Sequence, residues 1–277
     1  MAGKKKDTSL LHHLVGSRSL VWNLAKNDIK KKFAGSYFGV VWAFVQPVIT
    51  VLLYWFVFEK GLNSKATDLR TGIEIPFVLW LTAGLVPWFY FQEALNGGTG
   101  VLVEYSYLVK KVVFQIDMLP VVKMISALFT HLFFVAFTMV LFICMGYMPD
   151  WYALQVIYYS FCMILFATGL VYATSAVTVF FRDMKEVVGI LLQIGMWVTP
   201  IMWNFETMVQ IPGWAITVLK LNPMYYIVSG YRNALINHIG FWEDMGLTVY
   251  FWVVPAVILF LGTTVFKRLR PHFADVL

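Results

Sequence analysis

Residues 187–203 read VVGILLQIGMWVTPIMW, and residues 211–232 read IPGWAITVLKLNPMYYIVSGYR. The first string begins as an apolar span that Thr199-Pro200 interrupts, and the second is apolar but divided by Pro212 and Pro223. The pieces after Pro200 are too short to cross a bilayer as one helix and too apolar for a solvated linker. Backbone at membrane depth must satisfy its own hydrogen bonds unless protein or water surrounds it. We therefore predict two short re-entrant helices here, with two amphipathic helices lying flat at the interface as the alternative.

The composition of the whole chain is that of an integral membrane protein. Of 277 residues, 60% are hydrophobic and 13% are charged, whereas soluble domains carry about 25% charged residues. A helical span needs roughly 20 apolar residues, and six such stretches predict an all-α membrane fold. The predicted spans are residues 37–58, 75–95, 118–145, 151–180, 187–203 and 247–266. Cys144 and Cys162 both fall in apolar stretches, so neither a disulfide framework nor a metal site is expected.

The basic residues 1–36 precede the predicted transmembrane domain, residues 37–277. Lysines and asparagines occupy one face of this segment, which is typical of a helix lying on a membrane surface, its lysines facing anionic lipid. The apolar residues that recur at helical spacing on the other face are Leu11, Val15, Trp22, Ala25, Ile29 and Phe33.

The distribution of Lys and Arg predicts the orientation. Most of them lie in residues 4–32, 110–123, 182–185 and 267–270. Basic loops stay on the cytoplasmic side, so both termini are expected in the cytoplasm and residues 204–246 on the outer side. The net charge of +6 therefore reports orientation, and we expect no binding of nucleic acid.

Motifs for chemistry are sparse. The chain has no G-x-x-x-x-G-K-[ST] loop to cradle phosphates, and neither H-E-x-x-H nor G-x-S-x-G. The rival class is a membrane enzyme acting on a polyprenyl-linked glycan, and its candidate acids are Glu93, Glu104 and Asp117, which lack the spacing of metal ligands. Glu93, about a turn from the cytoplasmic end of its span, is more readily explained by a structural role or a substrate path.

The stretch Glu104–Val113 predicts a short cytoplasmic helix. Tyr105, Leu108, Val109 and Val112 share one face, and Lys110 and Lys111 lie off it. An amphipathic helix of this kind suits docking into a groove of a partner protein. Periodicity does not separate this interpretation from a helix that lies on the membrane surface.

Several motifs together resemble the type-2 ABC exporter permeases of cell-surface polysaccharides. Residues 35–47 (GSYFGVVWAFVQP) are similar to the first span of that family, and residues 84–96 with 108–112 (LVKKV) to its second span and first coupling helix. Phe181-Arg182-Asp183 resembles its second cytoplasmic link, and residues 199–201 (TPI), 222–223 (NP) and Arg232 its fifth span and outer gate. The resemblance covers nearly the whole chain and is closest to the wall teichoic acid permeases, with O-antigen and capsule permeases as near alternatives.

The resemblance implies a homodimer in the bacterial plasma membrane with two separate ABC ATPase subunits on its cytoplasmic side. ATP and Mg would be held by those partners, and this chain would carry no cofactor and no catalytic residue. The cargo would be a polymer linked to undecaprenyl diphosphate, with wall teichoic acid as the first candidate. A small-lipid or drug exporter of the same architecture is a further alternative.

Three groups of site residues follow from the patterns and the resemblance. The ATPase-coupling candidates are Tyr105, Leu108, Lys110, Lys111, Val112, Arg182 and Asp183. The candidates for the substrate path and the diphosphate are Lys30, Lys31, Lys32, Trp42, Trp88 and Glu93. The outer-gate candidates are Thr199, Pro200, Trp203, Trp214, Asn222, Pro223, Tyr225, Tyr226 and Arg232.

Overall fold

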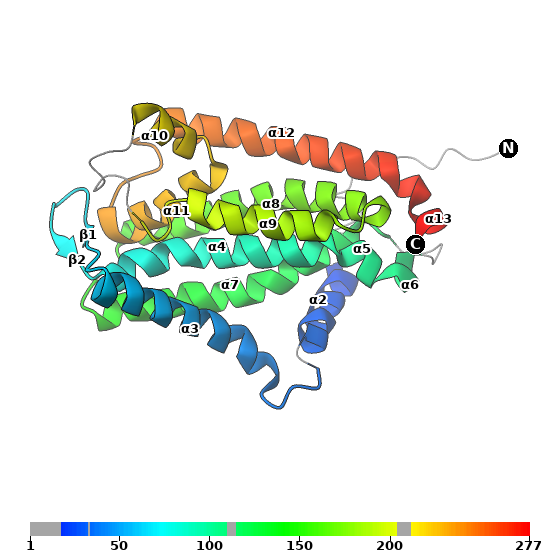
Figure 1. Ribbon diagram of the computed structural model, residues 1–277, viewed down its shortest axis with the longest axis horizontal. Helices are drawn as coiled ribbons and strands as arrows, with labels where there is room; N and C mark the ends of the chain where they lie inside the picture. The colour runs from blue at the N-terminus through cyan, green and yellow to red at the C-terminus, as the bar shows by residue number, and fades with distance from the viewer. Residues whose placement is uncertain (1–17, 33, 110–114, 204–211) are drawn as a thin grey trace.

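A computed structural model describes residues 18–32, 34–109, 115–203 and 212–277. Its long helices run along one axis, except that the first of them in the chain is inclined to the others (Figure 1). These helices are α3 (Trp42–Trp55), α4 (Phe77–Thr99), α7 (Met118–Cys144), α8 (Gln155–Phe180), α9 (Met184–Val198) and α12 (Met245–Leu269). The predicted helical class is confirmed in its coarse form, since the described chain is mostly helical.

In the described residues, four segments are long and apolar enough to cross a membrane: Trp42–Gly61, Met118–Cys144, Trp151–Phe180 and Met245–Val276. The first includes a π-helical turn, η2 (Phe56–Gly61), and the third begins with a 3-10 turn, η3 (Trp151–Leu154). The other two predicted spans are helices as well, α4 and α9. The 15 residues of α9 extend only about 22 Å, short of a hydrocarbon core of about 30 Å. The count of six spans and the domain boundary at residue 36 stay predictions.

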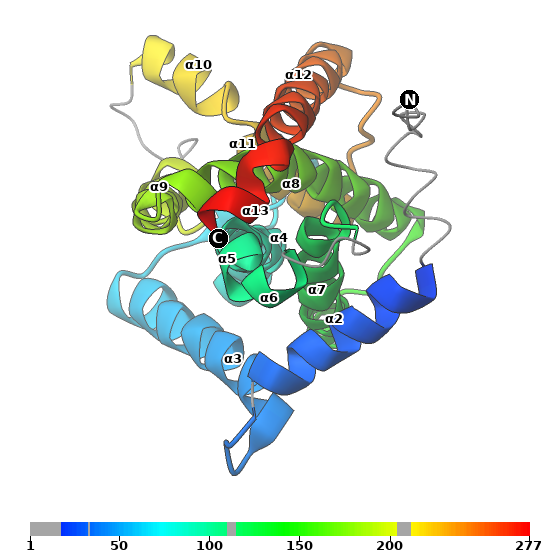
Figure 2. The ribbon, with the colours of Figure 1, turned by 90° about the vertical axis from the view of Figure 1, so that its right-hand side faces the viewer.

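The centre of the bundle is α4. In a view along the long axis, α3, α7, α8 and α9 surround it (Figure 2), and α4 contacts each of them. Leu79 and Leu81 of α4 are completely buried, although residues two apart project from nearly opposite sides of a helix. An apolar helix buried all round is typical of the core of a membrane bundle, so α4 is the element against which the others are placed.

One short β-hairpin departs from the predicted all-α fold. β1 (Ala66–Thr67) and β2 (Glu74–Ile75) pair antiparallel, with Ala66 opposite Ile75. The turn between them is fixed by Asp68, whose carboxylate accepts hydrogen bonds from the backbone of Arg70 and Thr71. Asp side chains commonly stabilise turns in this way, which is why a sequence without strand periodicity still forms a hairpin here.

In its described residues, 199–203 and 212–244, the broken region after α9 forms three short helical pieces at the hairpin end of the bundle (Figure 1). They are α10 (Gly213–Lys220), α11 (Pro223–Arg232) and the π-helical η5 (Asn233–Asn237). The predicted helix start at Asn222 is confirmed, because its side chain accepts a hydrogen bond from Met224 N and Pro223 is the first helical residue. Whether these pieces re-enter a membrane stays a prediction.

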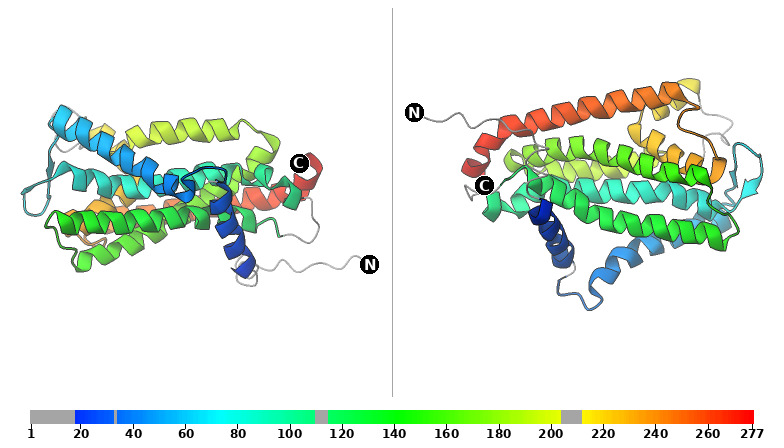
Figure 3. Two further views of the ribbon diagram at one scale, coloured as in Figure 1. Left: turned by 90° about the horizontal axis from the view of Figure 1, so that it is seen from below. Right: turned by 180° about the vertical axis from the view of Figure 1, so that it is seen from behind.

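The opposite end of the bundle carries α2 (Arg18–Lys32), α5 (Val101–Glu104), α6 (Ser106–Val109) and the C-terminal α13 (Phe273–Val276). We call it the C-terminal end. α2 crosses the bundle at an angle and packs on α7 (Figure 3). The face of α2 that is buried holds Val21, Ala25 and Asp28, whereas the predicted apolar residue Trp22 is exposed. Leu11, Val15 and Phe33 lie outside the described residues.

Trp22 lies beside the buried face, where its exposed ring is tilted against that of Phe129 of α7, with 5.2 Å between the centroids. Smaller side chains, Val21 and Ala25, take the contact with Met118 and Val122 of α7. The result is a close approach of α2 to α7, which the larger indole would have prevented. A helix with one buried face is therefore present in residues 18–32, and that face is rotated by one residue from the predicted one. Its position on a membrane surface stays a prediction.

Two glycines allow α8 and α12 to pack closely. A Cβ atom at Gly169 would lie 2.7 Å from the backbone nitrogen of Leu259, and a Cβ at Gly262 would meet the backbone of Gly169. Backbone atoms cannot yield as a flexible side chain does, so no larger residue fits. Small residues at such crossings are the usual basis of helix association in membranes.

We predict that Gly262→Val lowers the thermal unfolding midpoint of the detergent-solubilised protein, because overpacking of this kind costs about 1–3 kcal/mol. Gly189→Val is the control, since a Cβ atom at Gly189 would meet nothing within 4 Å. Equal midpoints for the two variants, measured by intrinsic fluorescence, would show that α8 and α12 are not held at this contact.

Candidate functional site

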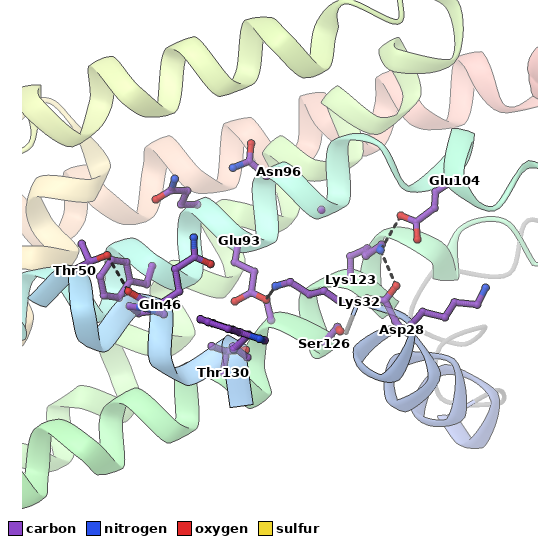
Figure 4. A pocket seen from close by; sticks show the side chains of 18 of the residues that line it. Asp28, Lys32, Gln46, Thr50, Glu93, Asn96, Glu104, Lys123, Ser126 and Thr130 are labelled. Atoms are coloured by element: carbon purple, nitrogen blue, oxygen red, sulfur yellow. Dashed lines mark hydrogen bonds and ion pairs between the residues drawn. The ribbon is translucent and has the colours of Figure 1, made fainter. Parts of the chain in front are cut away.

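A cavity of about 820 Å³ with both polar and apolar walls opens among α2, α3, α4, α5, α7 and α9. It extends from the middle of the bundle toward the C-terminal end (Figure 4). Its polar and charged lining residues are Asp28, Lys31, Lys32, Gln46, Thr50, Gln92, Glu93, Asn96, Glu104, Lys123, Ser126, Thr130 and Lys185. Ionisable side chains within a membrane bundle are costly and mark a functional path by default, so this cavity is the candidate site.

Glu93 of α4 meets Lys32, the last residue of α2, inside the cavity. Lys32 Nζ lies 2.6 Å from Glu93 Oε1, and the two side chains are 50% and 26% exposed. A pair with this much solvent contributes about 0–1 kcal/mol of stability. It can therefore open at little cost, and it joins the surface helix α2 to the central helix α4.

A second, more buried cluster lies next to it. Lys123 of α7 places Nζ 2.6 Å from Asp28 Oδ1 and 2.8 Å from Glu104 Oε2. The hydroxyl of Tyr105 donates to Asp28 Oδ1 at 2.9 Å. Burial raises the pKa of Tyr105, and its hydrogen bond to Asp28 acts in the same direction, so the phenol stays protonated and keeps donating.

The charges of the cavity leave an excess of one positive charge. Four lysines and three carboxylates line it, and the carboxylates are held by Lys32 and Lys123. Lys31 lies over the rings of Tyr105 and Tyr107, at 5.1 and 5.8 Å from their centroids, and Lys185 enters from α9. Such cations suit an anionic group, since charge-assisted bonds to phosphate are among the strong polar contacts.

The remaining walls combine aromatic rings with amides. Trp42, Tyr54 and Phe89 contribute apolar surface, and Gln46 and Gln92 contribute hydrogen-bonding groups. Aromatic faces pack on apolar surface while amides bind hydroxyls and phosphates. The cavity can therefore hold a molecule that is part apolar and part anionic.

Outside the cavity, another polar cluster lies at the hairpin end of the bundle, where Arg232 of α11 reaches the break after α9. Its guanidinium donates from Nη1 to Pro200 O and from Nη2 to Ile201 O, both at 2.7 Å, and from Nε to Trp80 O at 3.3 Å. The guanidinium carbon lies 3.3 Å from the centre of the Trp80 ring. Asn222 adds a hydrogen bond to Thr199 Oγ1 at 2.8 Å. The predicted break at Thr199-Pro200 is confirmed, and these groups satisfy the backbone that it exposes.

Comparison with known proteins gives the family. The sequence profile described as "ABC-2 type transporter" matches residues 19–236. This chain belongs to the ABC-2 type transporter family. It is 25% identical over 266 residues to the O-antigen export system permease protein RfbA of Myxococcus xanthus, covering 96% of this chain and 98% of that protein. It is 21% identical over 258 residues to the O-antigen export system permease protein RfbA of Klebsiella pneumoniae, covering 92% of this chain and 93% of that protein.

As an ABC-2 permease, the chain is a membrane subunit that works with an ABC ATPase. Of the predicted coupling residues, Arg182 and Asp183 are exposed in the link between α8 and α9. Tyr105 and Val109 are buried, and Leu108 packs against their cluster. The predicted single helix is divided at Tyr105, whose side chain turns inward toward Asp28. Lys110, Lys111 and Val112 lie outside the described residues, and the role of the whole set stays a prediction.

The predicted substrate-path residues separate into two groups in this ABC-2 permease. Lys31, Lys32, Trp42 and Glu93 line the cavity, whereas Lys30 is exposed elsewhere on α2. Trp88 is buried where α4 meets α9, and a Cβ atom at Gly195 would lie 3.0 Å from its ring. Periodicity identified the basic end of α2, but it did not reveal that only one side of it faces the cavity.

The predicted outer-gate residues also differ from one another. Trp214 is 72% exposed, and Trp203 donates its indole N–H to Trp197 O. Tyr225 and Tyr226 are buried, and the Tyr226 hydroxyl is hydrogen-bonded to those of Tyr158 and Thr248. Within one chain, Trp214 is therefore the aromatic residue of this set best placed to contact another molecule, and the gate itself stays a prediction.

Several cavity residues were not predicted from the sequence: Asp28, Gln46, Gln92, Lys123 and Lys185. Asp28 and Lys123 are 95 positions apart, so no local pattern joins them. One signal was present, because Asp28 follows Val21 and Ala25 at helical spacing, which places a carboxylate on the buried face of α2.

For Arg232, we predict that Arg232→Ala destabilises the permease by about 3 kcal/mol, because buried carbonyls left without donors cost about 1–3 kcal/mol each. Arg232→Lys should recover only part of this loss, since an ammonium cannot donate as a planar fork. Thermal unfolding in detergent measures both, with the exposed Lys220→Ala as the control. A wild-type unfolding midpoint for Arg232→Lys would mean that a positive charge alone stabilises the break after α9, without the paired donors of the guanidinium.

Proposed function

We propose that this ABC-2 permease exports a cell-surface polysaccharide linked to a lipid diphosphate, from the inner to the outer side of the bacterial plasma membrane. In this proposal two copies form the transmembrane path, both termini face the cytoplasm, and two ABC ATPase subunits bind on that side. ATP and Mg are held by the ATPase subunits. The C-terminal end of the bundle is the cytoplasmic end.

The observation that carries the proposal is the cavity among α2, α3, α4, α5, α7 and α9. It places lysines, amides and aromatic rings together at one end of an apolar bundle. A lipid-linked glycan presents the same three chemistries, because a diphosphate joins an apolar tail to a polar chain of sugars. Lys31, Lys32 and Lys185 supply the cations for the diphosphate, and Gln46 and Gln92 supply partners for hydroxyl groups.

Two polymers compete within this proposal. The names of the curated relatives refer to O-antigen export, whereas the motif resemblance alone favoured wall teichoic acid. Neither relative described above supports teichoic acid, so O-antigen is the first candidate and teichoic acid the second. Membership of a transporter family argues against the rival prediction of a membrane enzyme.

The decisive experiment reconstitutes the permease in vesicles with its partner ABC ATPase. We predict ATP-dependent transfer of an undecaprenyl-diphosphate-linked O-antigen to the opposite leaflet, measured by accessibility to an added glycosidase. The permease alone should hydrolyse no ATP, because it lacks a phosphate-cradling loop. Faster transfer of teichoic acid would reverse the order of the two polymers, and transfer of small lipids or drugs without either polymer would contradict the proposal.

Lys32 provides the sharpest single-residue test of the cavity. Lys32→Gln should lower export, because loss of a charge-assisted hydrogen bond costs about 1.5–3 kcal/mol and so weakens headgroup binding about 10- to 100-fold. Lys30→Gln is the matched control, since Lys30 is on the same helix and outside the cavity.

The measurement is the substrate concentration that gives half-maximal export. A defect of equal size in the Lys30 and Lys32 variants would mean that the basic end of α2 acts by orientation or lipid attraction, as the positive-inside rule predicts.

A further inference from the structure

Asp28 is an unusual residue for a surface helix. It is 5% exposed and is the one charged side chain among the buried residues of α2, which are Val21, Ala25 and Asp28. Burial of a carboxylate is costly unless it is paired and hydrogen-bonded. An apolar residue would pack at this position without that cost, so the partners of Asp28 indicate why a carboxylate stands there.

The partners of Asp28 come from two other segments of the chain. Lys123 belongs to α7, on which α2 packs through apolar contacts, and Tyr105 stands between α5 and α6. Lys123 also binds Glu104, the residue before Tyr105, so that its ammonium bridges two carboxylates (Figure 4). Asp28 therefore ties α2 to the α5–α6 segment, both directly through Tyr105 and indirectly through Lys123.

The α5–α6 side of this connection is firm. Tyr105 is 2% exposed and packs in a cluster with Val101 and Val109 from its own segment and with Phe266 and Phe273 from the C-terminal part of the chain. Lys31 of α2 also lies over the Tyr105 ring. Tyr105 therefore moves together with α5–α6. Its contacts with α2 would transmit that movement to α2.

The other side of the connection leads into the cavity. Lys32 follows Asp28 by four residues, one turn of the helix, so both side chains lie on the same face of α2. Lys32 reaches into the cavity and binds Glu93 of α4. The contact between Asp28 of α2 and Lys123 of α7 thus sets the rotation of α2, and with it the distance from Lys32 to Glu93.

We propose that Asp28 is a positioning residue for transport, which transmits movement of the ATPase-facing α5–α6 segment to Lys32 in the cavity. This inference rests on the proposed function, including the docking of the ATPase near α5–α6. The sequence of contacts is α5–α6, Tyr105, Asp28, α2, Lys32 and Glu93. When the ATPase shifts α5–α6, α2 turns, and the Lys32–Glu93 pair opens so that Lys32 can bind the anionic headgroup.

The test compares Asp28→Asn with Tyr105→Phe in the full complex with its ATPase. The first change keeps the shape of the side chain and removes its charge, and the second removes one hydroxyl. Both variants should raise the number of ATP molecules hydrolysed per polymer exported roughly tenfold, the lower end of what loss of a charge-assisted hydrogen bond produces. The double variant should be no worse than Asp28→Asn alone, because the two residues act on one path.

Matched controls are Asp275→Asn, an exposed carboxylate on α13, and Tyr107→Phe, an exposed phenol next to the cluster. Asp28→Glu should restore most of the coupling, since it keeps the charge. Thermal stability of the permease is measured in parallel, and the ratio of ATP to polymer is compared only among variants that assemble. If Asp28→Asn fails to assemble, Tyr105→Phe and its control Tyr107→Phe decide the question.

A wild-type ratio in Tyr105→Phe, or additive effects in the double variant, would overturn the positioning role even if both variants lose stability. These outcomes differ from failure of the proposed function, which would appear as absence of ATP-dependent export by the wild-type complex. That result would overturn the transport role of the cavity and the inference together.

Discussion

A broken helix in an apolar protein must satisfy its backbone without water, and in this chain Arg232 meets that requirement. The α9 helix ends before Thr199-Pro200, and the carbonyls of Pro200 and Ile201 receive hydrogen bonds from one buried guanidinium. The same group stacks on Trp80 and binds its carbonyl. Arg232 therefore joins the end of α9, the short helix α11 and the central helix α4, and the geometry of residues 187–232 depends on it.

The charges at the other end of the bundle are held differently. Lys32 and Lys123 there are paired with carboxylates. Lys32 can exchange the carboxylate of Glu93 for another anion, whereas the carbonyls of Pro200 and Ile201 would be left without a donor if Arg232 moved away. Lys32 and Glu93 are also partly exposed, so replacing Glu93 with another anion as the partner of Lys32 costs little free energy. The permease thus combines a fixed polar cluster at the hairpin end with one exchangeable ion pair in the cavity, Lys32–Glu93, beside the buried pair Lys123–Asp28. In the proposed function, an anionic lipid headgroup binds at the cavity end, and the cluster around Arg232 keeps the hairpin end rigid.

Much of the fold could be predicted from the sequence because its causes are local. Apolar runs give the helices, Thr199-Pro200 gives the break, and Asn222-Pro223 gives the start of α11. The hairpin of residues 66–75 was missed, since it depends on side-chain hydrogen bonds of Asp68 rather than on strand periodicity. The face of α2 was displaced by one residue because packing on α7 favours Val21 and Ala25 over the larger Trp22.

The candidate site was predictable only in part, because a cavity joins residues that are distant in sequence. Lys32 and Glu93 were identified as separate candidates, but their contact bridges 61 positions. Asp28 and Lys123 belong to no motif, and Gln46 belongs to the first-span motif without indicating a cavity. All three become site residues only because α2, α7 and α3 meet at one place. The sequence pattern places Tyr105 on an outward docking face, whereas its burial against Asp28 depends on a contact 77 positions away along the chain. The polymer class was the least predictable property, since no single residue pattern in the spans specifies a glycan.

Passage of a lipid-linked polysaccharide through the cavity is tested most directly by site-specific photocrosslinking in cells. A photoreactive amino acid is placed at Gln46, which lines the cavity on α3, or at Val253, which is exposed on α12 away from it. After illumination, the permease is purified and probed for the glycan and for its lipid carrier. We predict crosslinked glycan at position 46 and none at position 253, with the signal lost when synthesis of the polymer is blocked. No glycan at position 46 in a permease that still supports export, or equal signals at both positions, would contradict this path.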